Sequence, residues 1–319
     1  MPGVECLRAT AGNKPTAVTP ICTRPLNPFQ AGHMTQTKRQ TLLAVVAGLA
    51  IAGLSTVALA THSWAGYHWA RTTPQFTLKL GNNMTTADWR THLSQSSSDW
   101  NSGNSAVLTA IFAGTSSKRC AMVAGTTQVC NGKYGNNGWL GLASINITGG
   151  THITQGSAKM NDTYFDSATY NNPNERQHVV CQEVAHTFGL DHQSTDGSSQ
   201  NSCMDYFSNT GSNAGSTLST KPNQHDFDEL NIIYAHLDST TTIQSIAAEV
   251  AAMGQGPSAA NRDISDDPQS WGQLVRQSAD GRSSHYEREN GDGSKNATHV
   301  YWTLEAAARC VSCDHRHDR

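Results

Sequence analysis

An α+β fold is the class that this sequence predicts for its middle part. Several short segments there have the apolar composition or the alternation of β-strands. Three longer segments carry apolar residues at helical spacing and begin at residues that favour a helix start. These signals extend from Pro74 to Asp238, so we expect one folded domain within residues 61–238.

The expected strands differ in how deeply they should be buried. Phe76–Leu80 alternates apolar and polar side chains, which predicts a half-buried strand. Ala106–Ala113 and Trp139–Ile147 are apolar over most of their length, which predicts more deeply buried strands. The pattern in Ile153–Met160 is weaker, and we expect an edge strand there.

The first two expected helices each begin at a capping residue. Thr86 caps the first helix, whose apolar face carries Trp89, Leu93 and Trp100. The second helix starts at Asn172-Pro173, with Glu175 three residues after the capping Asn. It is expected to end at Gly189, because a glycine that reaches positive φ suits a helix C-terminus.

A third helix is expected from Lys221-Pro222 onward. Its apolar stripe consists of Phe227, Leu230, Ile233, Tyr234 and Leu237. Two histidines in this part of the chain, His225 and His236, are expected to be surface or capping residues. The apolar pattern then fades, so we expect residues 239–319 to form a polar tail or a small appendage.

The N-terminal part of the chain indicates export. Thr41–Ala60 contains no charge, follows two basic residues and ends in a small-x-small motif, which predicts a signal peptide cleaved after Ala60. The alternative is an uncleaved membrane anchor, since twenty apolar residues can span a bilayer. Translation from Met34 would make residues 34–60 the signal peptide and leave residues 1–33 untranslated or unstructured. We therefore expect a secreted protein that has no membrane contact after cleavage.

The overall charge limits the partners of the protein. Charged residues make up 15% of the chain, and its formal net charge is −3. Because phosphate binding needs a basic surface, this balance argues against nucleic acid as the main partner. The sequence has no internal repeat and no heptad pattern, and we expect a monomer.

Six cysteines follow Ala60, and an even number in an exported chain indicates disulfide bonds. We expect a bond between Cys120 and Cys130, which would close a short loop that contains Gly and Asn. Cys310 and Cys313 form a CxxC motif with two histidines nearby, which could bind a metal. In a polar tail, an incidental or locally oxidised pair is the preferred interpretation.

The most informative segment is 181–192, which contains a potential metal site. Residues four apart on a helix share a face, so Gln182 and His186 present their side chains to one point. Glu183 can reach a water at that point, and Gly189 allows a turn that returns His192 as a third ligand. Three protein ligands plus a water are the open arrangement of catalytic zinc.

This segment, ExxHxxGxxH followed by a downstream Met204, resembles the metzincin metallopeptidases, and the closing helix is similar to that of matrixins. The resemblance implies a twisted mixed sheet with three helices and a small subdomain after the active-site helix. It also implies that the protein is a zinc-dependent endopeptidase acting on proteins or peptides, with Glu183 as general base. Met204 would form the Met-turn, and Tyr206 would contact the metal or the oxyanion.

The chain departs from the family pattern at Gln182, where metzincins have their first histidine ligand. Its neutral amide oxygen should bind zinc less tightly, and the site would then depend mainly on His186 and His192 with extra water. His178 is one turn earlier, but its distance of ~12 Å along the axis from His186 argues against it. The alternative function is a catalytically weak or inactive pseudo-peptidase that serves as an extracellular binding module.

Three further expectations follow from the resemblance. A Met-turn packs beneath the metal, so a disulfide between Cys181 and Cys203 would brace the weakened site. About fifteen residues separate the signal peptide from the first strand, too few for a prodomain, so no activating cleavage is expected. Calcium is a second candidate cofactor because of Asn/Asp-containing loops, although no EF-hand spacing is present.

Overall fold

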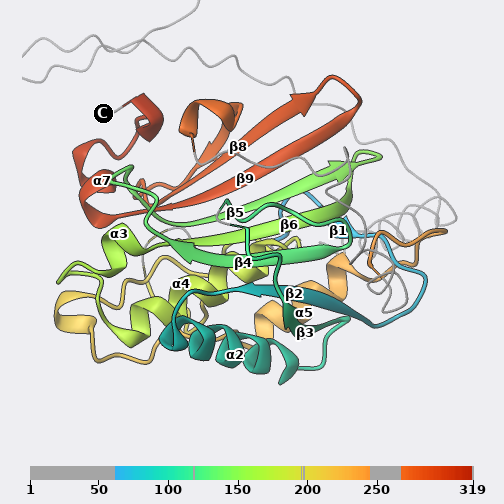
Figure 1. Ribbon diagram of the computed structural model, residues 1–319, viewed down its shortest axis with the longest axis horizontal. Coiled ribbons are helices and arrows are strands. Elements are labelled where there is room, and N and C mark those ends of the chain that lie inside the picture. Colours follow the sequence, from blue (N-terminus) through green and yellow to red (C-terminus); the bar gives the residue numbers. More distant parts are fainter. Residues whose placement is uncertain (1–61, 118, 195, 197, 245–266, 318–319) are drawn as a thin grey trace, which may run out of the picture. The chain divides into compact units, whose positions relative to one another are not determined.

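The computed structural model describes residues 62–317, apart from residues 118, 195, 197 and 245–266. Within these residues, nine strands form one mixed sheet in the order β3-β2-β4-β6-β5-β9-β8-β7, and β1 pairs with β6 beside this path (Figure 1). The expected α+β class with a mixed sheet is thus confirmed. The predicted signal peptide lies outside the described residues. No helix in the described part of the chain is long and apolar enough to cross a membrane.

One half of the sheet is parallel. Its strands are β1 (His68–Trp69), β2 (Phe76–Asn83), β3 (Val107–Ala113), β4 (Thr126–Gly132) and β6 (His152–Asn161). The expected edge strand Ile153–Met160 is instead β6, which lies inside the sheet between β4 and β5. Its polar side chains misled the prediction, because Gln155, Ser157 and Lys159 are buried. Strand β4 was not predicted for a similar reason, since most of its buried residues are polar.

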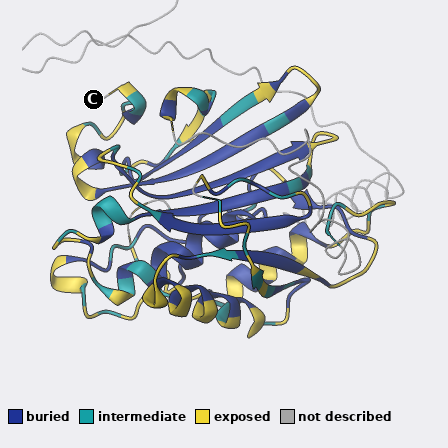
Figure 2. Ribbon diagram, in the orientation of Figure 1, coloured by how far each residue is buried: buried dark blue, intermediate teal, exposed yellow. Residues whose placement is uncertain are grey.

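The other half of the sheet is antiparallel and includes residues that were expected to form a tail or appendage. Its strands are β5 (Trp139–Thr148), β7 (Gln273–Gln277), β8 (Ser283–Asn290) and β9 (Ser294–Trp302). β9 pairs with β5 along nearly its whole length, so the C-terminal strands β7–β9 continue the sheet. Trp271, Tyr286 and Trp302 bury their side chains against Trp139 in a second apolar cluster. Figure 2 shows β5 and β9 buried along most of their length.

The described residues contain three longer helices, as predicted: α2 (Ala87–Asn101), α4 (Pro173–His186) and α5 (Gln224–Ile233). Thr86 and Asn172 cap the first two with their side chains, accepting from Trp89 N at 3.3 Å and from Glu175 N at 2.9 Å. α5 starts slightly later than expected, because Asn223 forms a capping box with Asp226. α4 packs against α2 on one side and against β5 and β6 on the other, which positions the centre described below. The shorter helices are α3 (Asp162–Phe165), α7 (Leu304–Arg309), η1 (Gly211–Asn213), η2 (Pro268–Ser270) and η3 (His315–His317).

α4 ends at His186, before the expected end at Gly189, and Gly189 lies in the turn that follows. Its φ is +93°, a conformation that favours glycine, and a Cβ there would overlap the backbone oxygen of Tyr67. The chain therefore turns sharply after α4 and comes back toward the helix at His192.

Candidate metal centre

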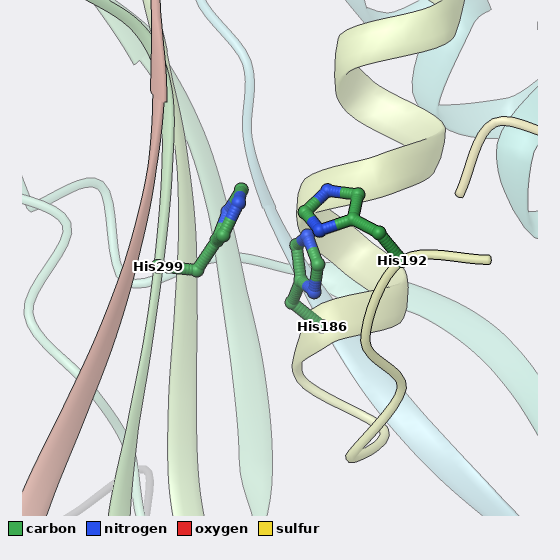
Figure 3. A group of neighbouring side chains, drawn as sticks. All are labelled: His186, His192 and His299. Atoms are coloured by element: carbon green, nitrogen blue, oxygen red, sulfur yellow. The ribbon is translucent and has the colours of Figure 1, made fainter. Parts of the chain in front are cut away.

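Three histidines from distant parts of the chain meet at the end of α4. His186 is the last residue of α4, His192 follows the turn at Gly189, and His299 comes from β9. Their ligand atoms all lie within 4.8 Å of one another, and Figure 3 shows the three rings converging. The ring centroid of His186 lies 4.7 Å from that of His192 and 3.8 Å from that of His299.

Two of these histidines have a ring nitrogen that is ready to bind a cation. His186 Nδ1 donates to the backbone oxygen of Leu190 at 2.9 Å, which leaves Nε2 as the lone-pair atom. Among the described residues, neither His186 Nε2 nor His192 Nε2 has a hydrogen-bond partner, although both atoms are buried. A buried polar atom without a partner costs free energy, so the pair fits a bound divalent metal.

The charge state of the cluster suits metal binding. Burial, together with the neighbouring imidazoles, holds the pKa values of His186, His192 and His299 well below the usual range. The rings are therefore neutral near pH 7, which is the form that coordinates a metal. His192 is further oriented through Nδ1, which lies 2.8 Å from Tyr206 Oη and 3.3 Å from Asp191 Oδ1.

Glu183 lies beside the histidines, on the face of α4 that packs against β5. Its Oε2 is 3.1 Å from His299 Nδ1, and its Oε1 is buried without a hydrogen-bond partner among the described residues. Burial raises the pKa of Glu183 well above its usual value. Gly141 of β5 makes this position possible, because a Cβ at that residue would overlap Glu183 Oε1 and lie 2.7 Å from Val179 Cγ1.

His299 was not predicted and takes part in two contacts. Besides Glu183, it lies against Ser283 of β8, with 3.1 Å between Nε2 and the serine Oγ. A metal held by His299 would have to replace one of these contacts. His285 of β8 lies nearby, with its ring centroid 5.1 Å from that of His299.

A hairpin signal in the sequence could have found both of these histidines. Asn290-Gly-Asp-Gly293 is a strong turn signal, and the flanking segments form β8 and β9. In the resulting register, His285 and His299 are directly paired. The pairing of this hairpin with β5, which brings it to α4, carries no local signal.

Gln182 contacts the backbone on both sides of Met204. Its Nε2 donates to the backbone oxygens of Cys203 at 2.9 Å and Asp205 at 2.8 Å. Its Oε1 is buried and has no hydrogen-bond partner among the described residues. His178 belongs to the same network, with Nε2 at 3.2 Å from the oxygen of Asp205 and Nδ1 at 3.2 Å from Asn209 Oδ1. That Gln182 is a metal ligand stays a prediction.

The segment around Met204 is covalently attached to α4 through its neighbour Cys203. Cys181 and Cys203 form a disulfide, as do Cys120 and Cys130, and these are the two pairs that the sequence predicts. A third disulfide joins Cys310 and Cys313. Met204 is fully buried, and its backbone oxygen accepts from Gln193 N at 2.7 Å, which ties the loop after His192 to the turn.

The centre is covered in this conformation. Glu183, His186 and His299 have no exposed surface, and His192 is 6% exposed. The C-terminal strands provide part of the cover, since His285 and His299 both come from them.

A scan of protein-family models finds none that matches the chain, and a search of curated proteins finds no similar sequence.

Proposed function

We propose that the protein is a secreted zinc-dependent metalloendopeptidase with a metzincin-like catalytic domain. The observation that carries the proposal is the pair of buried His186 and His192 Nε2 atoms, without hydrogen-bond partners in the described part of the chain, next to the Glu183 carboxylate. His186 and His192 would hold the metal, with His299 or Gln182 as third ligand. When bound, zinc would lower the pKa of a water toward ~7 and polarise the scissile carbonyl.

The surrounding residues have separate roles in this proposal. Glu183 takes the proton of the attacking water and passes it to the leaving amine, for which its Oε1 is available. Tyr206, 2.8 Å from His192 Nδ1, orients that ring and could move to donate to the developing oxyanion. Asp191 supports His192 from the other side, as carboxylates do for metal-bound histidines.

Strand β9 occupies the place where an extended peptide would bind. Peptides commonly add as a strand to a free sheet edge, and β5 would be such an edge without β9. Besides the β5–β9 pairing and the apolar cluster, side-chain contacts hold the C-terminal strands here: Tyr67 Oη donates to Glu287 Oε1 at 2.7 Å, and Arg276 pairs with Asp191. Catalysis therefore requires that these strands move away. This differs from our expectation that the exported chain needs no activating step.

The second candidate function is a binding module without catalytic activity. The burial of Glu183 and its contact with His299 favour it, because they leave no room for substrate in this conformation. Gln182, which stands where metzincins have their first histidine ligand, also favours the binding module.

Cleavage of casein and zinc content together separate the two functions. We expect Tyr67→Phe/Arg276→Ala, which removes these two side-chain contacts and so weakens the docking of the C-terminal strands, to cleave faster than the parent protein. Glu183→Gln in the same background should abolish cleavage and retain zinc, since it keeps the shape of the side chain but not the base. A double variant that holds zinc and cleaves nothing would favour the binding module. Equal zinc content in the parent and in His192→Ala would contradict a metal at this centre.

A further inference from the structure

A second group of potential ligands lies away from the centre, where three segments of the chain meet. His68 comes from β1 and His152 from the first residue of β6, and the two are register partners in the parallel β1–β6 pair. His236 and Asp238 follow α5. We call these four residues the His68 cluster. His68, His152 and Asp238 have ligand atoms that lie within 4.8 Å of one another.

Four distances between ligand atoms of the His68 cluster are close to those of a tetrahedral metal site. Asp238 Oδ1 lies 3.1 Å from His152 Nε2 and 3.7 Å from both His68 Nε2 and His236 Nε2. The Nε2 atoms of His68 and His236 are 3.1 Å apart. Ligands bound to zinc at ~2.0–2.1 Å in a tetrahedron are separated by ~3.3–3.4 Å. The two distances of 3.1 Å are shorter than this value, and the two of 3.7 Å are longer.

The neighbouring contacts direct the lone pairs toward one point. His68 Nδ1 donates to the backbone oxygen of Gly66 at 2.8 Å, so its Nε2 is the lone-pair atom. Asp238 Oδ2 accepts from the backbone N–H of Arg71 at 2.9 Å, which leaves Oδ1 facing the histidines. Only one proton can lie between the facing Nε2 atoms of His68 and His236, whereas a cation satisfies both nitrogens.

The exposure of the four side chains allows a metal to enter and then be held. The side chains of His68 and Asp238 are 7% and 8% exposed, whereas those of His152 and His236 are 33% and 53% exposed. Half of the site is therefore fixed in the protein, and the other half is accessible from solvent.

We propose that the His68 cluster is a closed structural zinc site with three histidine ligands and one aspartate. Four protein ligands leave no open position for a substrate, in contrast to the centre at α4. The bound zinc would pin the segment after α5 to β1, and just beyond that strand Asp238 N already donates to the backbone oxygen of Arg71 at 2.8 Å. This inference does not depend on the proposed peptidase activity.

Zinc stoichiometry of the purified full chain and of ligand variants tests the site. We expect about two zinc ions per parent chain. His236→Ala and His152→Ala should each lose one zinc on dialysis against a chelator, while His192→Ala should lose the other. His225→Ala is the matched control, because its exposed side chain lies on α5 outside the cluster, and it should keep both ions. Unchanged zinc content in both cluster variants would overturn the proposal and leave an ion-pair cluster around Asp238.

The melting temperature gives a second test of the site, which can be applied even if a ligand variant is less stable than the parent. In the His192→Ala background, adding zinc to chelator-treated protein should raise the melting temperature, since only the folded state has the assembled site. The additional change His236→Ala should remove most of this rise. An equal rise in both proteins would contradict the site, as would no rise in either.

Discussion

Replacing Gln182 by methionine separates the two possible third ligands of the centre. Methionine fills a similar volume but cannot donate to the backbone oxygens of Cys203 and Asp205. Among the described residues, Gln182 is the hydrogen-bond partner of the Cys203 oxygen, whereas Asp205 keeps its contact with His178. Losing the first bond should cost ~1–3 kcal/mol and weakening the second ~0.5–1.5 kcal/mol.

The same substitution also removes an unfavourable feature. Gln182 Oε1 is buried with no hydrogen-bond partner in the described part of the chain, and removing it should return ~1–3 kcal/mol if no metal is bound there. The two effects nearly offset, so the net loss of unfolding free energy should be only about 1 kcal/mol. For a domain of this size, that loss lowers the melting temperature by ~2–4 °C.

Thermal unfolding followed by circular dichroism, with zinc analysis of the same samples, tests this expectation. Gln182→Met should melt slightly below the parent and keep its zinc, whereas His299→Ala should lose the zinc of this centre. The reasoning is refuted if Gln182→Met loses that zinc and melts far lower while His299→Ala retains it. In that case Gln182 Oε1 is the third ligand, as the sequence predicts.

Three further predictions concern the surroundings of the centre. Gly141→Ala should destabilise the protein by ~1–3 kcal/mol and reduce any cleavage, because the added Cβ overlaps Glu183. Gly215→Ala is the control, since a Cβ there would lie in open space. Equal unfolding curves for the two variants would contradict the packing at Gly141. Burial and the bond to Glu287 raise the pKa of Tyr67 to about 12, so its contribution is complete below pH ~10 and is lost as the pH rises toward 12. Over this pH range the unfolding free energy of the parent, measured with urea, should therefore fall by on the order of 2 kcal/mol more than that of Tyr67→Phe. Equal falls in the two proteins would argue against the contact. Removing the Cys181–Cys203 disulfide with a double alanine variant should lower the unfolding free energy by ~3 kcal/mol, because its ends are 22 residues apart. Removing the Cys310–Cys313 disulfide, whose ends are 3 residues apart, should lower it much less. The reverse order would contradict loop closure as the source of the stabilisation.

The sequence was sufficient where the determining interactions are local. His186 and Glu183 follow from helix periodicity, and the caps at Thr86 and Asn172 follow from side chains that bond to nearby backbone. The turn that returns His192 follows from Gly189, which adopts a φ that disfavours other residues. Each of these features depends on residues only a few positions apart.

The rest depends on pairings between segments far apart in the chain. His299 reaches α4 only because β9 pairs with β5, about 150 residues earlier, and no local pattern specifies that partner. His236 is exposed, as expected, but its proximity to His68 of β1 could not be read from the sequence for the same reason. β4 and β6 bury polar residues, so hydrophobic patterning underestimated their position in the sheet.

The position of His299 gives the C-terminal hairpin a thermodynamic consequence. The strand that covers the centre also supplies a potential ligand, so docking of the hairpin and binding of the metal are linked equilibria. If docking increases metal affinity by a given factor, the metal stabilises docking by the same factor, and a hundredfold effect corresponds to ~2.7 kcal/mol. A chelator would then loosen the hairpin, and a peptide that displaces the hairpin would weaken the hold on the metal. With His299 as a ligand, the metal therefore favours the closed state, and any substrate must compete with both.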